Sequence, residues 1–229
     1  MPYSHTTRYP AFSASLHWWA LTEQPAELAR QCAALGIPAE CSARALSRQR
    51  ELLAERLLLH HITGRYAPVV HNADRAPSVE GLDAHVSIAH SRQWLCIAVS
   101  SSPIGIDIES HGRHLAAVRQ GFLNDAEQQW IAEADALPLL VAWTAKEAMF
   151  KAVSVRQGLH YRDHLRLDPF ALPATEAEFE ISHRGHCHGV DFGLLSSISP
   201  QLVLTIAQAC NDGAAAATTT EQHQNSIIT

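Results

Sequence analysis

No stretch of this sequence is apolar over the roughly 20 residues that a membrane-spanning helix requires, so no membrane partner is expected. The first eight residues contain no apolar segment of the kind that opens a signal peptide. The five cysteines are odd in number, irregularly spaced and without a CxxC pair. These absences argue against a disulfide framework or a zinc ribbon and favour a cytoplasmic location.

A basic surplus is also missing, because the formal net charge is −6. A general nucleic-acid binder usually carries a basic face, so that class of function is not expected. Glycine-rich phosphate loops, GxSxG elbows and HExxH helices are absent as well. With 47% hydrophobic and 17% charged residues, the composition is that of an ordinary globular protein.

Lysine is nearly absent. Of the 17 basic residues only Lys146 and Lys151 are lysines, and they bracket Glu147. The use of arginine at all other basic positions is attributed to genome composition and carries no functional information. The two lysines are informative exceptions, because a compact ammonium differs chemically from a planar guanidinium. Residues 146–151 are therefore candidate functional residues, with chance clustering as the alternative.

Hydrophobic periodicity and turn residues predict the order of elements. The sequence indicates a helix over 42–61 with Ser42 as N-cap and Gly64 as stop, strands over 86–89, 94–99 and 104–109, a helix over 138–153, a hairpin of 178–182 and 189–195 around Arg184-Gly185, and a strand over 202–207.

These elements predict an α+β fold made of two similar halves, each a long helix packed on a small antiparallel sheet. The boundary is placed near Pro103, which gives an N-terminal half of residues 1–102 and a C-terminal half of residues 103–210. Residues 211–229 are rich in alanine and threonine and then polar, so this tail is expected to be disordered.

The first candidate site motif is Gly105-Ile106-Asp107-Ile108-Glu109. Alternate side chains of a strand share a face, so Asp107 and Glu109 point the same way. Adjacent carboxylates repel each other unless a cation or proton lies between them. Mg²⁺ typically binds one or two carboxylates together with phosphate oxygens and water. A solvent-exposed strand end is the alternative.

The second motif runs from Trp143 to Lys151. Trp143, Glu147 and Lys151 lie at i, i+4 and i+8 and so form one stripe of a helix. If Glu147 faces the strand motif, three carboxylates surround one cation, and Lys151 meets the anion that the cation carries. A weak surface ion pair between Glu147 and Lys151 is the alternative.

Other polar groups are weaker signals. His90-Ser91 ends a strand, where it could bind a phosphate, and Arg75-Ala76-Pro77 places a cation in a stiff turn. Arginines of the 42–61 helix could bind phosphates, although a solvated helix face explains most such runs. The cluster of His183, His186, Cys187 and His188 has no second ligand pair at finger spacing and is interpreted as a polar turn.

Taken in this order, the motifs resemble the 4′-phosphopantetheinyl transferases of the type that activates surfactin and siderophore synthetases. The family pattern, Gly-x-Asp-x-Glu followed by Trp-x-x-Lys-Glu-Ala-x-x-Lys, is matched by residues 105–109 and 143–151. The resemblance covers roughly residues 44–207. Ala89 departs from a serine of the family, and its residues for the adenosine 3′-phosphate have no clean counterpart in Arg48-Gln49-Arg50-Glu51.

The resemblance implies a Mg²⁺-dependent transfer of phosphopantetheine from coenzyme A to a serine of an acidic apo acyl or peptidyl carrier protein, in a cleft between the halves. Asp107, Glu109 and Glu147 would hold Mg²⁺, and Glu147 or a metal-bound water would act as base. Lys151 and His90 would neutralise charge during transfer. The expected coenzyme A contacts are Arg75, Pro77, His90, Ser91, Arg48, Arg50, Lys146 and Lys151.

Two other functions stay open on the residues alone. One is a different Mg²⁺-dependent phosphotransfer enzyme that uses the same carboxylates, and the other is a non-catalytic module that binds coenzyme A or a carrier. The physiological carrier is not specified by the motifs. A chain built from two similar halves has less need to dimerise, so a monomer is expected.

Overall fold

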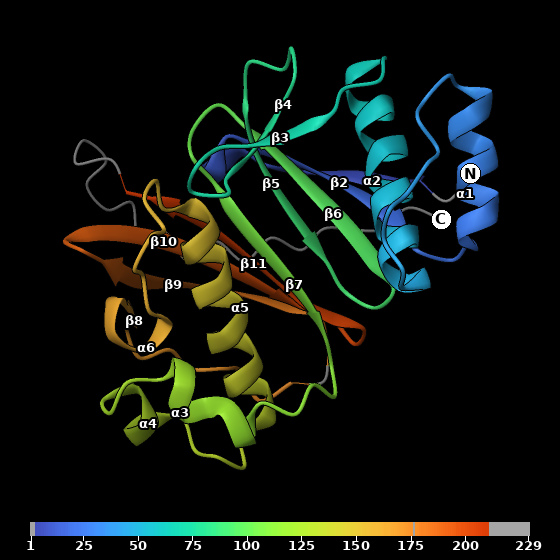
Figure 1. Cartoon of the computed structure of the whole chain (residues 1–229). Coiled ribbons are helices and arrows are strands. Elements are labelled where there is room, and N and C mark those ends of the chain that lie inside the picture. Colours follow the sequence, from blue (N-terminus) through green and yellow to red (C-terminus); the bar gives the residue numbers. More distant parts are fainter. Residues whose placement is uncertain (1–2, 176, 211–229) are drawn as a thin grey trace.

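The computed structural model describes residues 3–175 and 177–210, so the predicted disordered tail lies outside the described residues. Two antiparallel sheets stand side by side, each with one long helix on its outer face (Figure 1). The predicted α+β class with antiparallel sheets is confirmed. The sheets differ in size and strand order, and the equivalence of the two halves stays a prediction.

The first sheet has the order β1-β2-β6-β5 and carries two helices on one face. Its strands are β1 Tyr3–Tyr9, β2 Ala14–Ala20, β5 His85–His90 and β6 Trp94–Ser100, its helices are α1 Pro25–Ala34 and α2 Leu46–Thr63, and a short η1 spans Pro10–Phe12. A separate hairpin joins β3 Val69–His71 to β4 Pro77–Val79.

The second sheet has the order β7-β11-β10-β9-β8. Its strands are β7 Gly105–Ser110, β8 Leu165–Leu167, β9 Phe179–Cys187, β10 Val190–Ile198 and β11 Leu202–Ala209. Its helices are η2 Ala116–Val118, α3 Arg119–Phe122, α4 Glu127–Trp130, α5 Ala136–Ala152 and α6 Tyr161–His164.

Helix α5 lies across this sheet and contacts β7 and β11 (Figure 1). It approaches β7 so closely that a Cβ atom on Gly105 would collide with the carbonyl oxygen of Ala148. The glycine of the strand motif is therefore required for close packing of the helix. This packing brings the two predicted site motifs together.

The two sheets meet along a seam between β5 and β7. A buried cluster with members from both sheets, including Leu16, Ile106 and Ile206, fills the space behind the seam. The backbone N–H of Ile106 donates to Ser87 Oγ across it at 3.0 Å. The seam thus fixes the end of β5 relative to the acidic residues of β7.

Most elements predicted from the sequence are confirmed, including β5, β6, β7, β11 and α5. Two details were wrong. The hairpin turns at His188-Gly189, both with positive φ, while Arg184-Gly185 lies inside β9. Helix α2 starts after Ala45 instead of Ser42, although it ends at Gly64 in the left-handed conformation as predicted.

The cluster at 183–188 is correspondingly not a polar turn. His183, His186 and Cys187 belong to β9, and the side chain of His183 is buried. Within residues 3–175 and 177–210, no helix combines the length and the apolar character needed to cross a membrane.

Candidate active site

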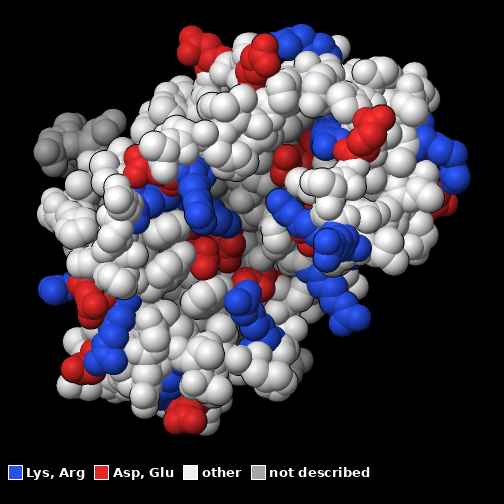
Figure 2. Space-filling view, viewed as in Figure 1, with Lys and Arg blue, Asp and Glu red and all other residues white. Residues whose placement is uncertain are grey.

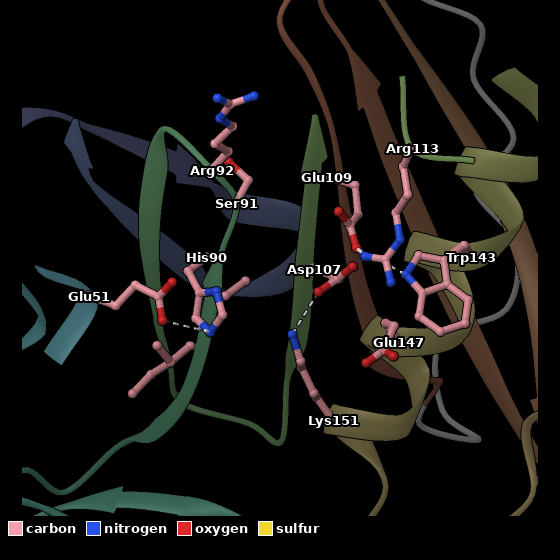
Figure 3. A pocket seen from close by; sticks show the side chains of 12 residues that line it. Glu51, His90, Ser91, Arg92, Asp107, Glu109, Arg113, Trp143, Glu147 and Lys151 are labelled. Atoms are coloured by element: carbon pink, nitrogen blue, oxygen red, sulfur yellow. Dashed lines mark hydrogen bonds and ion pairs between the residues drawn. The ribbon is translucent and has the colours of Figure 1, made fainter. Parts of the chain in front are cut away.

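A cavity of about 510 Å³ opens at the seam, and residues of both halves line it (Figure 3). Glu51 of α2 and the end of β5 form one wall, and β7 and α5 form the other. Its polar lining residues are Glu51, His90, Ser91, Arg92, Asp107, Glu109, Arg113, Trp143, Glu147 and Lys151. The structure therefore brings His90 and Ser91 together with both central motifs.

Asp107 is the most enclosed carboxylate of the cavity, with 7% of its surface exposed. Its Oδ1 accepts a hydrogen bond from Lys151 Nζ at 2.8 Å, and Lys151 also donates to the carbonyl oxygen of Ile106 at 2.9 Å. Asp107 Oδ2 is buried without a partner. Burial raises the pKa of Asp107, and Lys151 only partly opposes that shift.

Glu109 lies two residues further along β7, on the same face as Asp107. It pairs with Arg113, and its Oε1 also accepts the indole N–H of Trp143 at 3.1 Å. The Arg113 guanidinium lies 4.8 Å from the centre of the Trp143 ring. The sequence motifs do not include Arg113, which follows the turn after β7, and a spacing of i+4 indicates an ion pair only on a helix.

Glu147 faces this strand from α5 (Figure 3). Burial raises its pKa, and the nearby charge of Asp107 raises it further. Burial, together with the nearby charge of Glu147, raises the pKa of Tyr161 well above its usual value. Tyr161 follows α5 in the chain, and no motif indicates its role.

His90 ends β5 on the opposite wall, where its Nε2 lies 3.7 Å from Glu51 Oε2. Burial lowers the pKa of His90, while Glu51 opposes that shift. Ser91 is 8% exposed, and its Oγ is buried without a partner. This hydroxyl is therefore available to a ligand in the cavity.

A second cavity of about 230 Å³ adjoins the first and shares Ile88, His90 and Lys151 with it. Its basic lining residues are Arg48, His71, Arg75, His90, Lys151 and Arg156, and Pro77 also lines it. Figure 2 shows acidic side chains in the central hollow and basic side chains on both sides of it. The first cavity, in which four carboxylates accompany Arg92, Arg113 and Lys151, is termed the acidic cavity. It continues into the basic cavity, where Glu55 is the one acidic residue among the described residues that line it.

Two predicted coenzyme A contacts lie elsewhere. Lys146 is fully buried, and its Nζ donates to Glu127 Oε2 at 2.6 Å and to the carbonyl oxygens of Phe122 and Tyr161. The prediction that Lys146 binds coenzyme A is therefore wrong. Arg50 lines neither cavity and donates to the carbonyl oxygen of Arg92 at 3.2 Å, so Arg48 is the better candidate of the two arginines.

The carboxylates Asp107, Glu109 and Glu147, the predicted ligands of Mg²⁺, line the same cavity. In the part of the chain that the structure describes, no three His, Cys, Asp or Glu side chains form a group that could hold a metal ion as they stand. Lys151 is hydrogen-bonded to Asp107 instead, and Arg113 is paired with Glu109. The unpartnered Asp107 Oδ2 and the all-oxygen ligand set fit a hard cation, so the metal site stays a prediction.

The geometry places carboxylates and basic side chains around two adjoining cavities, and such a site suits a charged ligand. Comparison with known proteins indicates a class of protein with such a site. Residues 103–207 match the model of the 4′-phosphopantetheinyl transferase superfamily. This segment includes both central motifs and nearly all of the second sheet, so the resemblance predicted from the motifs is confirmed.

Two curated relatives point the same way. The chain is 31% identical over 75 residues to 4′-phosphopantetheinyl transferase gsp of Aneurinibacillus migulanus, a match over 31% of this chain and 32% of that protein. It is 30% identical over 117 residues to enterobactin synthase component D of Salmonella austin, over 49% and 50% of the two chains. The matches thus span half or less of the length of these relatives.

Proposed function

We propose that this protein transfers the 4′-phosphopantetheine group of coenzyme A to a serine of an apo acyl or peptidyl carrier protein and releases 3′,5′-ADP. The overlap of the acidic and basic cavities at His90 and Lys151 is the observation that carries the proposal. A pyrophosphate-containing cosubstrate needs oxygen ligands for a cation and basic groups for its phosphates. The family match of residues 103–207 supports the same reaction.

Asp107, Glu109 and Glu147 would hold Mg²⁺, which supplies charge neutralisation at the carboxylates and the pyrophosphate. Glu147 accepts the proton of the carrier serine as the serine oxygen bonds to the phosphorus attached to pantetheine. The bond from that phosphorus to the oxygen of the departing 3′,5′-ADP breaks. Lys151 and His90 stabilise the charge that develops, which is the main catalytic contribution in phosphoryl transfer.

Coenzyme A is proposed to extend from the shared residues into the basic cavity. Arg48, Arg75 and Pro77 line that cavity, and Ser91 lies on the acidic side. Arg50 contributes indirectly, because it holds the backbone of Arg92 beside Ser91. This assignment predicts binding of coenzyme A by the first half and of the cation by the second.

The test is mass spectrometry of several apo-carriers incubated with coenzyme A, Mg²⁺ and the protein. We expect one phosphopantetheine per carrier, and a loss of at least about 100-fold in rate for Glu147→Gln, in line with the loss of a general base. The exposed Glu133→Gln is the matched control and should retain full rate. If every carrier stays unmodified, the transferase activity is contradicted. Another phosphotransfer enzyme or a binding module is then the interpretation.

The carrier is proposed to be acidic, although the protein itself carries a net charge of −6. Attraction must then come from local basic residues beside the cavities, such as Arg48, Arg92 and Arg113. Electrostatic association of this kind weakens as salt screens the charges. We expect kcat/KM for the carrier to fall as NaCl increases from 50 to 500 mM, and an unchanged value contradicts this charge pairing.

The proposed setting is the cytoplasm, with the protein acting as a monomer. The five cysteines are free, as expected in a reducing compartment. Both walls of the cavity come from one chain, so no second copy is needed to complete it. Light scattering after size-exclusion chromatography that gives a dimer mass would contradict the monomer.

A further inference from the structure

Glu109 holds two different donors on a single carboxylate oxygen. Its Oε1 accepts the indole N–H of Trp143 at 3.1 Å, and the guanidinium of Arg113 pairs with the same oxygen. The Arg113 guanidinium also lies over the Trp143 ring, with its central carbon 4.8 Å from the ring centre. The three side chains therefore contact one another at one wall of the acidic cavity (Figure 3).

The two donors differ in how firmly they are held. Trp143 belongs to α5, stacks on Tyr161 with a centroid distance of 5.9 Å and packs edge-on against Phe122 at 5.2 Å. Arg113 follows the turn after β7, outside any helix or strand, and 44% of its side chain is exposed. The indole is thus a fixed donor, whereas the guanidinium can leave Glu109 by rotation of its own side chain.

The charge of Arg113 does what a bound cation would do for the carboxylates of β7. Neighbouring carboxylates repel each other unless positive charge lies beside them. Asp107 is paired with Lys151 at 2.8 Å, and Glu109 is paired with Arg113. Lys151 is also anchored to a backbone carbonyl at 2.9 Å, whereas the further contact of Arg113 is the face of the Trp143 ring. Arg113 is therefore the more easily displaced of the two cationic side chains.

We propose that Arg113 is a displaceable counter-ion of Glu109, which neutralises this carboxylate in the cation-free protein and leaves it when a divalent cation binds. Trp143 is the matching positioning residue, because its hydrogen bond to Oε1 keeps Glu109 oriented after the guanidinium has left. This inference rests on the proposed function, since it assigns Glu109 to a cation. It predicts opposite effects on cation affinity for the two donors of one oxygen.

The expected sizes follow from the two kinds of contact. A partly exposed ion pair is weak, so the need to break it lowers cation affinity only severalfold. If Arg113 stayed on Glu109, its charge would repel the bound cation. A group that hydrogen-bonds a metal-ligating side chain orients it, and losing such a group typically lowers metal affinity by about 10- to 100-fold.

The test is titration of the protein with Mn²⁺, a paramagnetic substitute for Mg²⁺, followed by electron paramagnetic resonance without coenzyme A. We expect Arg113→Gln to lower the Kd for Mn²⁺ about fivefold, because the cation no longer has to break the ion pair. Trp143→Phe keeps an aromatic ring without the donor and should raise the Kd about 10-fold. Arg184→Gln removes the same charge from an exposed position of β9 outside both cavities and should stay within twofold of wild type.

A double-variant cycle separates competition for Glu109 from simple charge repulsion. In the Glu109→Gln background, Arg113→Gln should change the Kd by less than twofold, because no ion pair remains to be broken. Nuclear magnetic resonance adds a direct readout, with the indole N–H signal of Trp143 assigned by its absence in Trp143→Phe. This signal should shift as Mg²⁺ is added to wild type, since the guanidinium leaves the face of the ring, and the shift should be at least halved in Arg113→Gln.

An unchanged or higher Kd for Mn²⁺ in Arg113→Gln overturns the displacement, and so does a wild-type protein that binds no Mn²⁺. A fivefold gain that persists in the Glu109→Gln background overturns it as well. If Glu109→Gln binds no Mn²⁺, the indole signal decides, and equal shifts in wild type and Arg113→Gln overturn the displacement. Tighter Mn²⁺ binding by Arg113→Gln in a protein that modifies no carrier leaves the displacement intact and contradicts the proposed function instead.

Discussion

The ammonium of Lys146 is enclosed by Glu127 and two carbonyl oxygens, whereas the ammonium of Lys151 faces the candidate site. The sequence makes the two rare lysines look equivalent. Helical geometry separates them, because residues five apart on a helix point about 140° away from each other. Lys151 lies one turn from Glu147 on the same stripe of the helix. The spacing in the sequence therefore already indicates that Lys151, and not Lys146, faces the candidate site.

Replacing Lys146 should destabilise the fold without a direct effect on ligand binding. Lys146→Met keeps the length of the side chain and leaves the carboxylate of Glu127 buried, at 1% exposure, without its cation. Breaking a buried ion pair in this way costs about 3–5 kcal/mol. Urea unfolding measures the loss, with Arg162→Ala, which breaks an exposed pair with Asp125, as a control expected to cost about 1 kcal/mol or less. A loss below that of the control contradicts the structural role.

His183 should make stability depend on pH in the acidic range. Burial lowers the pKa of His183 to about 4, and its Nε2 is hydrogen-bonded to Ser196 Oγ at 2.9 Å. The folded protein holds this group neutral, while the unfolded chain binds a proton near pH 6.5. Its contribution is therefore complete above pH 6.5 and is lost as the pH falls to about 4, by about 3 kcal/mol at most.

The measurement is the free energy of unfolding of wild type and His183→Gln between pH 4 and pH 7.5. The wild-type value should fall more steeply below pH 6.5 than that of the variant, because only wild type must bury a neutral imidazole. Parallel curves for the two proteins contradict the burial of a neutral His183.

At the scale of elements, β7 could be predicted because its isoleucines alternate with Asp107 and Glu109. Helix α5 could be predicted because residues 136–152 form a long, mostly apolar segment without glycine, with Pro138 in its first turn. The hairpin of β9 and β10 was predicted with its turn in the wrong place. Gly185 was interpreted as a turn residue, but a Cβ atom there would collide with Sδ of Met149 on α5. A glycine in a strand can allow a helix to pack closely against it, and a glycine can also form a turn. The sequence alone does not distinguish these two roles.

Gly105→Ala should affect both the stability and the site, because the added Cβ meets backbone atoms of α5 that have little room to move. Overpacking of this kind costs about 1–3 kcal/mol. Moving α5 away from β7 also separates Glu147 from Asp107. We expect a lower unfolding temperature and a transfer rate reduced at least about 10-fold at a temperature where the variant is folded, since small misplacements of catalytic groups are costly.

Gly121→Ala is the matched control for that substitution. Gly121 lies in α3, and a Cβ atom there meets no other group within 4 Å. Alanine favours a helix over glycine by up to about 1 kcal/mol, so this variant should be at least as stable as wild type and fully active. Equal behaviour of the two variants would show that the close contact of α5 with β7 does not govern the site.

At the scale of the whole molecule, the candidate site combines residues from segments that are distant in the sequence, so no local sequence pattern connects them. The three carboxylates, Lys151 and His90 were found from motifs, because each motif is a short segment. Tyr161 and Arg156 were missed, because they act through contacts with residues that are distant in the chain or on the preceding helix. Tertiary packing alone brings Arg156 to the basic cavity and stacks Tyr161 on Trp143.

Arg156 connects the two halves at the basic cavity. Its Nη1 donates to the carbonyl oxygen of Arg75 at 3.2 Å, its Nη2 donates to the carbonyl oxygen of Lys151, and its backbone N–H lies 3.4 Å from Asp74 Oδ1. Arg75 has a φ of 60°, a conformation that a residue with a side chain adopts only when its surroundings hold it there. Arg156 therefore adds to the local hydrogen bonds that Arg75 and Ala76 donate to Asn72 in holding the turn, which places Arg75 beside the predicted coenzyme A.

Removing this connection should weaken coenzyme A binding. For Arg156→Ala we expect the Kd for coenzyme A, measured by isothermal titration calorimetry, to rise about 10-fold, which corresponds to about 1.4 kcal/mol. Arg156→Lys keeps the charge but not the planar fork that reaches two carbonyl groups, so it should bind only slightly better than the alanine variant. Arg184→Ala, an exposed arginine of β9 outside both cavities, should bind as wild type does. Wild-type affinity in Arg156→Lys would assign the weakened coenzyme A binding of Arg156→Ala to the loss of charge alone. Wild-type affinity in Arg156→Ala would show that the turn of Arg75 holds its position without Arg156.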